Sequence, residues 1–333
     1  MEIKGISTVI ASVLMLMIVI ALAGTAYLYI SGTFTSKTAT TFEIIESVND
    51  TVTIRNSGTE AITNIKATLD GGDVNIAVVP NIQGLVGYWS FNEGSGSTTA
   101  DNSGNGNVGT LFNNPTWVDG KFGKALWFDG VDDYVLTGST GLNNQEITIN
   151  VWIKPDTSNN PIYSGQNRIA SVLANGGFYL YNDIGDGKSA AHIVHYWGRW
   201  SYTSTPDNII ENGKWYPIAF VISTVNGGTQ RIYVNGELRG ENTNIGFSSI
   251  NLLEPNIGRA SWGGTTHYFH GLIDEVAIYN RALSESEIKQ LHSGLVSPGQ
   301  TATIKPLISL SKGTHTLRLC TSSMCSTAIL TII

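Results

Sequence analysis

The segment from residue 101 to residue 107, DNSGNGN, combines oxygen-bearing side chains with glycines in a way that suits a hard metal ion. The oxygen-bearing side chains occupy alternate positions: Asp101, Ser103, Asn105 and Asn107. Ca²⁺ prefers six to eight oxygen ligands, and glycines between them ease the tight turn that such a loop needs. Phe112 stands where an EF-hand loop would carry its bidentate glutamate. The pattern predicts a calcium loop completed from elsewhere in the fold, or a Gly/Asn turn without metal.

Aromatic side chains gather around one cation in the run HYWGRWSY, residues 195–202. The candidate glycan-binding residues of this run are Tyr196, Trp197, Arg199, Trp200 and Tyr202. Amphipathic aromatic rings beside a guanidinium suit stacking on sugar rings, but alternate aromatics also fill sandwich cores. Trp262 lies in a glycine-flanked loop and joins the candidates by its expected exposure.

The acidic residues of the chain do not form the pattern of a glycoside hydrolase. Retaining glycosidases need two carboxylates about 5–5.5 Å apart. Asp274 and Glu275 are adjacent, so a regular strand would point them to opposite faces. We therefore expect a non-enzymatic protein. The net charge of −7 and the low lysine content also argue against nucleic acid as a partner.

Two covalent features are expected outside the cytoplasm. Cys320 and Cys325 are the only cysteines, and in an oxidising compartment they would close a hairpin as a disulfide; the alternative is a pair of reduced thiols. Asn49 begins the sequon Asn-Asp-Thr and is a candidate glycosylation position.

The elements that position these residues are mostly strands. Residues 147–155 alternate apolar and polar side chains with the period of a half-buried strand, and Asn235-Gly236 predicts a hairpin turn. Similar patterns at 42–69 and 297–319 predict about seven short strands, near the number in a small β-sandwich. Neither of these flanks is long enough to form a core alone, so we expect them to fold together.

The N-terminal segment from Ile6 to Ser36 has no charged residue and is long enough to span a bilayer as a helix. Three interpretations compete: a secretory signal cut after the run Ala21-Leu22-Ala23, an uncleaved membrane anchor, and a prepilin leader cut between Gly5 and Ile6. The apolar pattern continues past Ala23, which disfavours the first interpretation. Lys4 would stay on the cytoplasmic side.

The sequence KGISTVIASVLMLMIVIALAG resembles the class III signal and N-terminal domain of archaeal type IV pilins and archaellins. The resemblance implies cleavage at Gly5/Ile6 by a prepilin peptidase, transit through the membrane, and assembly with copies of the same chain by the pilus machinery. Ile10 stands where many bacterial pilins carry glutamate, so the likeness is to the archaeal proteins. NSGTEAITN, SPGQTATI and GTHTLRL resemble the immunoglobulin-like heads of such proteins.

The intervening segment resembles the concanavalin A-like, laminin-G-type jelly roll. The resemblance is carried by ordered blocks that include GYWSFNEGSG, DNSGNGNVGTL, FDGVDDYV, NVWIKP and GLIDEVAIYNRALSESEI. It implies a two-sheet sandwich that binds glycans or proteins, often with structural calcium. Because the first and last strands pair in this family, Glu93, Asp274 and Glu275 are the expected additional calcium ligands.

These observations predict a mainly β fold with a long N-terminal apolar helix, a small immunoglobulin-like sandwich and an inserted jelly roll. The expected boundaries are a leader at 1–5, the helix at 6–37, a head at 38–83 and 296–333, and the jelly roll at 84–295. We expect a pilin-like filament subunit on the cell surface whose jelly roll adheres to glycans or surfaces. The alternative is a membrane-anchored glycan-binding protein that does not polymerise.

Overall fold

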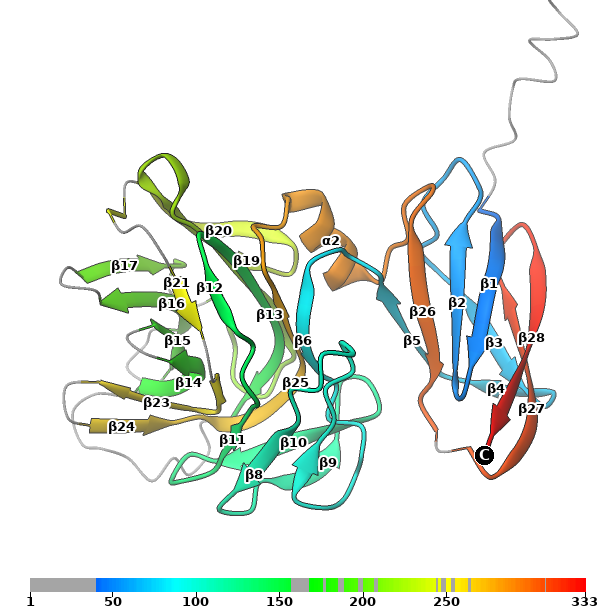
Figure 1. Ribbon diagram of the computed structural model, residues 1–333, viewed down its shortest axis with the longest axis horizontal. Coiled ribbons are helices and arrows are strands. Elements are labelled where there is room, and N and C mark those ends of the chain that lie inside the picture. The colour runs from blue at the N-terminus through cyan, green and yellow to red at the C-terminus, as the bar shows by residue number, and fades with distance from the viewer. Residues whose placement is uncertain are drawn as a thin grey trace, which may run out of the picture.

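The computed structural model describes residues 40–156, 168–175, 178–184, 189–196, 200–206, 209–243, 245–246, 250–252, 255–262, 265–308 and 310–333. Two β-rich lobes lie side by side (Figure 1). The larger lobe is formed by the middle of the chain. The smaller lobe combines segments from both ends of the described part.

The larger lobe is a sandwich of two sheets. The first sheet has the strand order β20-β19-β18-β13-β25-β10-β9, and β6 also pairs with β25. The bounds of these strands are β6 (Leu85–Trp89), β9 (Thr116–Asp119), β10 (Lys124–Asp129), β13 (Glu146–Pro155), β18 (Tyr216–Ser223), β19 (Thr229–Val234), β20 (Glu237–Thr243) and β25 (His270–Tyr279).

The second sheet has the strand order β17-β16-β15-β14-β22-β11-β8-β7. The bounds of these strands are β7 (Thr98–Thr99), β8 (Gly109–Phe112), β11 (Tyr134–Leu136), β14 (Arg168–Asn175), β15 (Phe178–Ile184), β16 (Ser189–Tyr196), β17 (Trp200–Ser204) and β22 (Asn256–Ile257). Two ribbons, β12 (Leu142–Asn144) with β21 (Ile250–Leu252) and β23 (Arg259–Trp262) with β24 (Thr265–Tyr268), and a 3₁₀ turn, η1 (Val225–Gly227), complete the lobe.

Alternating side chains build the core between these two sheets. Ile147, Ile149, Val151 and Ile153 of β13 are fully buried and pack with residues of the facing sheet such as Val135. The sequence predicted this inward face. The hairpin turn at Asn235-Gly236 is also confirmed, because both residues adopt positive φ between β19 and β20.

The smaller lobe is a second sandwich of two four-stranded sheets, with the orders β1-β2-β26-β5 and β28-β27-β3-β4. The bounds are β1 (Phe42–Val48), β2 (Thr51–Asn56), β3 (Lys66–Leu69), β4 (Gly72–Val74), β5 (Ile76–Pro80), β26 (Thr301–Pro306), β27 (Gly313–Cys320) and β28 (Cys325–Ile332). Its core joins side chains from both ends of the described chain, including Val52, Ile54, Ile304 and Leu317. The chain leaves this sandwich after β5, forms the larger lobe, and returns at β26.

One short α-helix, α2 (Glu285–Ser293), is present among the described residues. Ser284 and Glu287 form a reciprocal capping box at its start, and Gly294 ends it in the left-handed conformation. Ile288 of the helix packs on the outer face of the first sheet, against a cluster that includes Tyr233 and Tyr279.

The expected fold class is wrong in its helical part. Mainly β structure is confirmed, but the described part of the chain contains no helix long and apolar enough to cross a membrane. Its α-helix is α2, which has 9 residues and one buried side chain. Residues 6–37, where the long helix was expected, lie outside the described residues, as does the leader cleavage position Gly5/Ile6.

Candidate functional site

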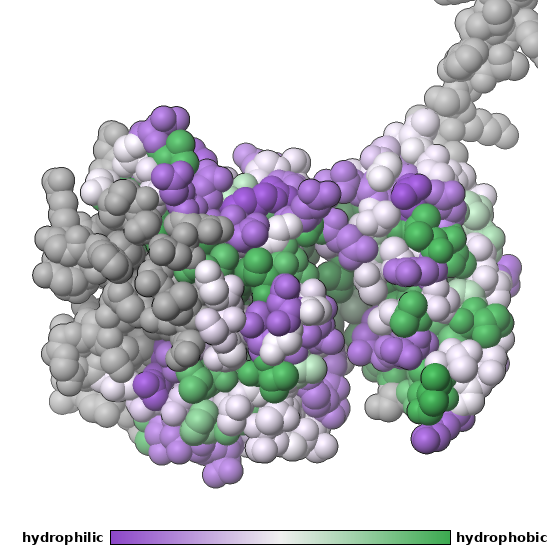
Figure 2. All heavy atoms as spheres, viewed as in Figure 1, coloured by the Kyte–Doolittle hydropathy of each residue, from purple (hydrophilic) through white to green (hydrophobic). Residues whose placement is uncertain are grey.

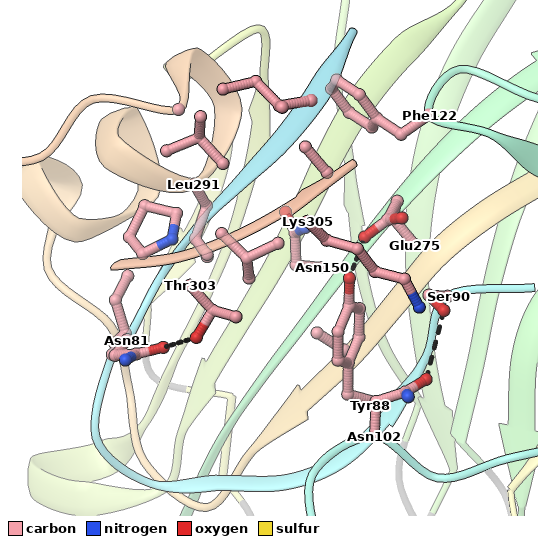
Figure 3. Close-up of a pocket in the computed structure, with 18 of the residues that line it drawn as sticks. Asn81, Tyr88, Ser90, Asn102, Phe122, Asn150, Glu275, Leu291, Thr303 and Lys305 are labelled. Atoms are coloured by element: carbon pink, nitrogen blue, oxygen red, sulfur yellow. Dashed lines mark hydrogen bonds between the residues drawn. The ribbon is translucent and has the colours of Figure 1, made fainter. Parts of the chain in front are cut away.

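A cleft of about 800 Å³ lies between the two sandwiches. Figure 2 shows a recess between the lobes, and Figure 3 shows the side chains that line it. One wall is the outer face of the first sheet of the larger lobe, and the other is formed by β5 and β26 of the smaller lobe, with the end of α2 beside them. The polar and aromatic side chains that line the cleft include those of Asp50, Asn81, Tyr88, Ser90, Asn92, Asn102, Lys121, Phe122, Asn150, Trp152, Glu275, His292, Thr303 and Lys305.

Side chains alternate between the two faces of β13, and this alternation explains which of them reach the jelly-roll wall of the cleft. Ile149 and Val151 point into the sandwich core, so Asn150 and Trp152 point outward into the cleft. Asn150 is opposite Ala277 in the β13–β25 ladder, and Trp152 is opposite Asp274. Residues directly opposite in a ladder share a face, so this face of β25 also turns toward the cleft.

A β-bulge in β25 brings an acidic side chain into the cleft. The register shifts between Asn150 and Trp152, so Glu275 and Val276 together oppose one residue of β13. Glu275 adopts φ +52°, a left-handed conformation that is costly for a residue with a long side chain. Val276 still points into the core, whereas Glu275 lines the cleft. The reasoning that placed Asp274 and Glu275 on opposite faces is therefore wrong, because it assumed a regular strand.

Glu275 is the central polar group of the cleft (Figure 3). The Tyr88 hydroxyl donates a short hydrogen bond to Glu275 Oε2, and Glu275 Oε1 is buried with no partner among the described residues. Burial raises the pKa of Glu275 from 4.5 to about 7. Burial, followed by the neighbouring Glu275 charge, also raises the pKa of Tyr88 well above 10. The carboxyl group is therefore mostly protonated below pH 7 and about half protonated near it, and in the protonated form it can donate as well as accept a hydrogen bond.

Asp274 holds in place a loop that lines the cleft. It is fully buried, and its Oδ2 accepts hydrogen bonds from the backbone N–H groups of Lys121 at 2.8 Å and Phe122 at 3.1 Å. Burial, with the adjacent Glu275 charge, raises the pKa of Asp274 well above its usual range. Asp274 thus fixes the loop that carries Lys121 and Phe122.

This loop covers one end of the cleft with an aromatic pair and a cation. Phe122 meets the Trp152 ring edge-on, with centroids 5.5 Å apart. The Lys121 ammonium lies 4.8 Å from the centre of the Trp152 ring, a distance at which a cation–π interaction is favourable. Lys121 has no acidic ion-pair partner among the described residues, so its charge is available to a ligand.

Residues of the smaller lobe and of α2 form the opposite side of the cleft. Lys305 pairs with Asp50 at 3.1 Å, and Thr303 donates to Asn81 Oδ1 at 3.0 Å. His292 Nε2 lies 2.7 Å from Asn150 Oδ1, and burial lowers the pKa of His292 to about 3. His292 is therefore neutral across the ordinary pH range.

The cleft also contains amide groups with unused hydrogen-bonding capacity. Asn102 Oδ1 accepts from Ser90 Oγ at 3.1 Å, and Asn92 Oδ1 accepts from the Lys124 backbone N–H at 2.8 Å. Within the described part of the chain, neither amide nitrogen has a hydrogen-bond partner. The arrangement can therefore supply amide donors, an ammonium group and a protonated carboxyl group to a polar ligand.

The loop expected to bind calcium is held by hydrogen bonds to its own backbone and to β6. Asp101 accepts from the N–H groups of Tyr88, Ser103 and Asn107, each at 2.9 Å, so both of its oxygens are used. Asn105 and Asn107 donate their amides to the carbonyl of Val86 at 3.2 and 2.8 Å. These contacts account for the alternation of polar residues without an ion.

The other expected calcium ligands, Glu93, Asp274 and Glu275, each form hydrogen bonds with different partners. Glu93 accepts from the Ala100 N–H at 2.8 Å and from the Thr99 hydroxyl, while Asp274 holds the loop at Lys121 and Glu275 meets Tyr88. Among the described residues, one group of three acids has ligand oxygens within 4.8 Å of one another, and it does not include these residues. The positions found here do not fit one calcium centre, and calcium at these residues stays a prediction.

The expected glycan-binding aromatics lie at one edge of the second sheet. Tyr196 is opposite Trp200 in the β16–β17 ladder, and Tyr202 of β17 is 51% exposed. Trp262 belongs to β23 and pairs through its backbone with Thr265. Trp197 and Arg199 lie outside the described residues. The backbone thus places Trp200 and Tyr202 on the edge strand β17 and Tyr196 on the neighbouring strand β16.

The expected disulfide is confirmed: Cys320 and Cys325 are joined where β27 and β28 meet. Asn49 occupies the turn between β1 and β2 with φ +52°, a conformation that asparagine tolerates well. Its glycosylation stays a prediction.

Comparisons with known proteins assign the fold of the larger lobe. Residues 129–289 match the family model described as the concanavalin A-like lectin/glucanases superfamily. This part of the chain therefore carries a concanavalin A-like jelly-roll domain, as the sequence blocks predicted. No curated protein matches the chain.

Three solved structures illustrate what this chain is similar to. The binding domain of Paraclostridial Mosquitocidal Protein 1 has a TM-score of 0.51 and 18% identity, covering 63% of this chain and 52% of that chain. Domain 4 of AbnA, a GH43 extracellular arabinanase from Geobacillus stearothermophilus, in complex with arabinotriose, has a TM-score of 0.47 and 22% identity, covering 62% and 98%. The botulinum neurotoxin serotype G binding domain has a TM-score of 0.48 and 19% identity, covering 62% and 50%. This chain spans about half the length of the two toxin domains.

Proposed function

We propose that this protein is a non-enzymatic glycan-binding protein and that the cleft between the two sandwiches is its binding site. The observation that carries the proposal is the concentration of polar groups around the Trp152–Phe122 pair, in a cleft open to a ligand. A glycan offers many hydroxyl groups, which pair with the amide donors of Asn92 and Asn102 and with the protonated Glu275. The lectin-containing superfamily of the jelly roll supports the same ligand class.

The positions and contacts of Asp274 and Glu275 favour glycan binding over glycan hydrolysis. A retaining glycosidase needs two carboxylates that both reach the sugar. Asp274 is fully buried and already accepts two backbone N–H groups, so it serves as a support for the Lys121 loop. Of these two acids, Glu275 is the one that offers its carboxyl group to the cleft, and Asp50, which also lines the cleft, is paired with Lys305.

The chain's apolar N-terminal segment supports display outside the cytoplasm. Residues 6–36 carry no charge, and the Lys4-Gly5-Ile6 junction resembles an archaeal prepilin leader. On this basis we propose a cell-surface location in which copies of the chain assemble into a filament; the alternative is a membrane-attached protein that does not polymerise. N-terminal sequencing of the mature protein distinguishes leader processing, which leaves Ile6 first, from an uncleaved anchor, which leaves Met1. Electron microscopy of the cell surface then tests for filaments.

The glycan proposal is tested by screening the full chain on an array of neutral and acidic glycans, followed by calorimetric titration of the best binder. Lys121→Ala and Asn102→Ala each remove a cleft group that the fold does not use for its own core. Loss of a hydrogen bond to a charged or polar partner of this kind weakens binding by about 10-fold. Lys124→Ala is the matched control, because it removes a nearby lysine that pairs with Asp119 outside the cleft.

Tyr202→Ala separates the cleft from the aromatic edge of the second sheet. If Tyr202→Ala abolishes binding while the two cleft variants bind normally, the site lies at the β16–β17 edge and the cleft assignment is wrong. If no glycan on the array binds the full chain, the proposed function fails.

A further inference from the structure

The cleft between the two sandwiches carries an excess of positive charge, although the whole chain is acidic. The acidic, basic and histidine side chains in its described lining are those of Asp50, Lys121, Glu275, His292 and Lys305. Asp50 and Lys305 neutralise each other in an ion pair at 3.1 Å, and His292 is uncharged because burial lowers its pKa to about 3. When Glu275 is protonated, the Lys121 ammonium is therefore an uncompensated positive charge in a protein whose net charge is −7.

Lys121 is held where a ligand can reach its charge. The side chain is exposed, and its ammonium lies 4.8 Å from the centre of the Trp152 ring and 5.8 Å from that of Phe122. Asp274 fixes the loop by accepting the Lys121 backbone N–H at 2.8 Å. An aromatic ring attracts the ammonium from one side only, so the N–H donors on its other side stay available to a ligand.

The hydrogen-bonding groups that the protein leaves free in the cleft are mainly donors. The side-chain oxygens of Asn92 and Asn102 already accept hydrogen bonds from Lys124 N–H and from Ser90 Oγ. Their amide nitrogens have no partner in the described part of the chain. A sugar hydroxyl both donates and accepts, whereas a carboxylate only accepts. A set of free groups made of two amides and an ammonium therefore matches a carboxylate better than a neutral sugar.

The fold brings these donors to the same wall of the cleft. A methyl group at Gly123 would lie 2.1 Å from Asn92 Oδ1, so Asn92 packs against the loop that carries Lys121. The Asn102 backbone N–H donates to the Tyr88 carbonyl at 2.7 Å, which fixes Asn102 beside β6. Figure 3 shows Asn102 and Tyr88 on the same side of the cleft as Glu275. The amide donors thus lie around the part of the cleft that Glu275 occupies.

We propose that the ligand of the cleft is a glycan with a carboxylate group, such as a uronic-acid residue, and that Lys121, Asn92 and Asn102 recognise this carboxylate. The inference rests on the proposed function and narrows it from glycans in general to sugar acids. Hydrogen bonds to an ionised acceptor are roughly twice as strong as those between neutral groups. Carboxylate oxygens are also more basic than those of a sulfate ester, so they accept more strongly from amide and ammonium donors. The apolar face of the sugar ring would pack on the half-buried Phe122 ring.

The test uses the purified full chain with detergent throughout, because residues 6–30 are dominantly apolar, and a buffer at pH 6, where Glu275 is mostly protonated. The probes are oligogalacturonate, oligomannuronate and hyaluronan fragments, each beside its neutral, carboxyl-reduced counterpart. A keratan sulfate fragment supplies sulfate without carboxylate. Calorimetric titration gives the Kd of each probe in about 50 and about 500 mM NaCl, because salt screens an exposed charge contact. We expect a carboxylated probe to bind about 10-fold or more tightly than its reduced counterpart, with a smaller advantage at high salt.

Two cleft variants and one control locate the carboxylate. Lys121→Gln should weaken binding of the carboxylated probe by about 10-fold and remove most of its salt dependence. Asn102→Asp keeps the oxygen that accepts from Ser90 but replaces the amide donor with a negative charge, so it should weaken the carboxylated probe by about 10-fold or more and spare the neutral one. Lys124→Gln removes an exposed lysine paired with Asp119 and should bind as the wild type does. Wild-type melting temperatures show that the variants fold.

The outcomes separate this inference from the proposed function. If neutral counterparts bind as tightly as the carboxylated probes, or if neutral glycans alone bind, the carboxylate assignment is wrong while glycan binding stands. Equal binding of keratan sulfate would show a site for anions in general and would also overturn the assignment. An undiminished preference for carboxylate in both Lys121→Gln and Asn102→Asp would place the carboxylate elsewhere. If no glycan of any class binds, the proposed function fails together with this inference.

Discussion

Replacing Glu275 with glutamine should change how the stability of this protein depends on pH. Glu275 is 8% exposed, and burial raises its pKa from 4.5 in the unfolded chain to about 7 in the folded protein. The folded state therefore keeps a proton that the unfolded state releases. This contribution to stability is fully present below about pH 4.5 and is lost as the pH rises toward and through 7. One pKa unit corresponds to about 1.4 kcal/mol, so the whole effect is about 3 kcal/mol.

Glutamine keeps the shape of the protonated side chain and can still accept the hydrogen bond from the Tyr88 hydroxyl. We expect Glu275→Gln and the wild-type protein to have similar free energies of unfolding near pH 4.5. Above pH 8 the variant should be more stable by about 3 kcal/mol, because it has no charge to bury. Denaturant unfolding at half-unit intervals between pH 4.5 and 9 measures the difference.

Two comparisons isolate the effect of Glu275. Glu60→Gln removes one negative charge from an exposed position and corrects for the change in net charge. His292 changes stability in the opposite direction: burial lowers its pKa to about 3, so its contribution is present above pH 6.5 and is lost as the pH falls. The wild-type curve alone therefore mixes both effects, whereas the difference from Glu275→Gln cancels the His292 contribution and reports Glu275 together with the part of the Asp274 shift that the Glu275 charge causes. If this difference is constant from pH 4.5 to 9, Glu275 does not carry a raised pKa and our description of the cleft is wrong.

Three further changes test the packing of the fold by thermal or denaturant unfolding. Replacing both Cys320 and Cys325 by serine opens a short loop and should cost about 2 kcal/mol; an unchanged stability under non-reducing conditions would show that the bond does not constrain the chain. Gly87→Ala places a methyl group 2.5 Å from the buried Trp89 ring and should cost about 1–3 kcal/mol, whereas Gly72→Ala, whose new methyl group meets only the Leu69 carbonyl oxygen at 3.7 Å, is the control for a lost glycine. Ser284→Ala removes the N-cap of α2 and should cost about 1 kcal/mol, while Ser284→Asp should retain most of the stability.

The sequence predicts the strands of this protein better than its helix. Ile147, Ile149 and Leu317 face their cores because alternation is a local property of the chain, and the disulfide follows from the spacing of Cys320 and Cys325. The sequence blocks also identify the jelly roll. The pair Ser284 and Glu287, a serine followed three residues later by a glutamate, is a local sequence signal for the start of α2. The expectation of a long apolar helix rested on hydropathy, length and the resemblance to archaeal pilins, whereas the described helix, α2, is short and amphipathic.

The cleft could not be predicted from local patterns, because its walls come from segments far apart in the chain. Lys305 and Asp50 line the cleft because segments from the two ends of the described chain pair with each other in the small sandwich. Lys121 lies over Trp152 because Asp274, more than a hundred residues later, binds its loop.

The bulge at Glu275 is a second reason to place the binding site in the cleft. A regular β25 would have no extra residue and no glutamate at φ +52°, and it would not bury a carboxyl oxygen without a partner. Backbone conformations of this kind cost about 1–3 kcal/mol and persist where the surrounding structure requires them, often at functional sites. Here the conformation does not improve the sandwich core, because Val276 fills that position. What the bulge does provide is a carboxyl group in the cleft, opposite Tyr88 and near Lys305. A ligand that hydrogen-bonds to the Glu275 carboxyl group would offset the cost of this backbone conformation. A ligand bound at the Tyr202 edge of the second sheet would not contact Glu275 and could not offset that cost.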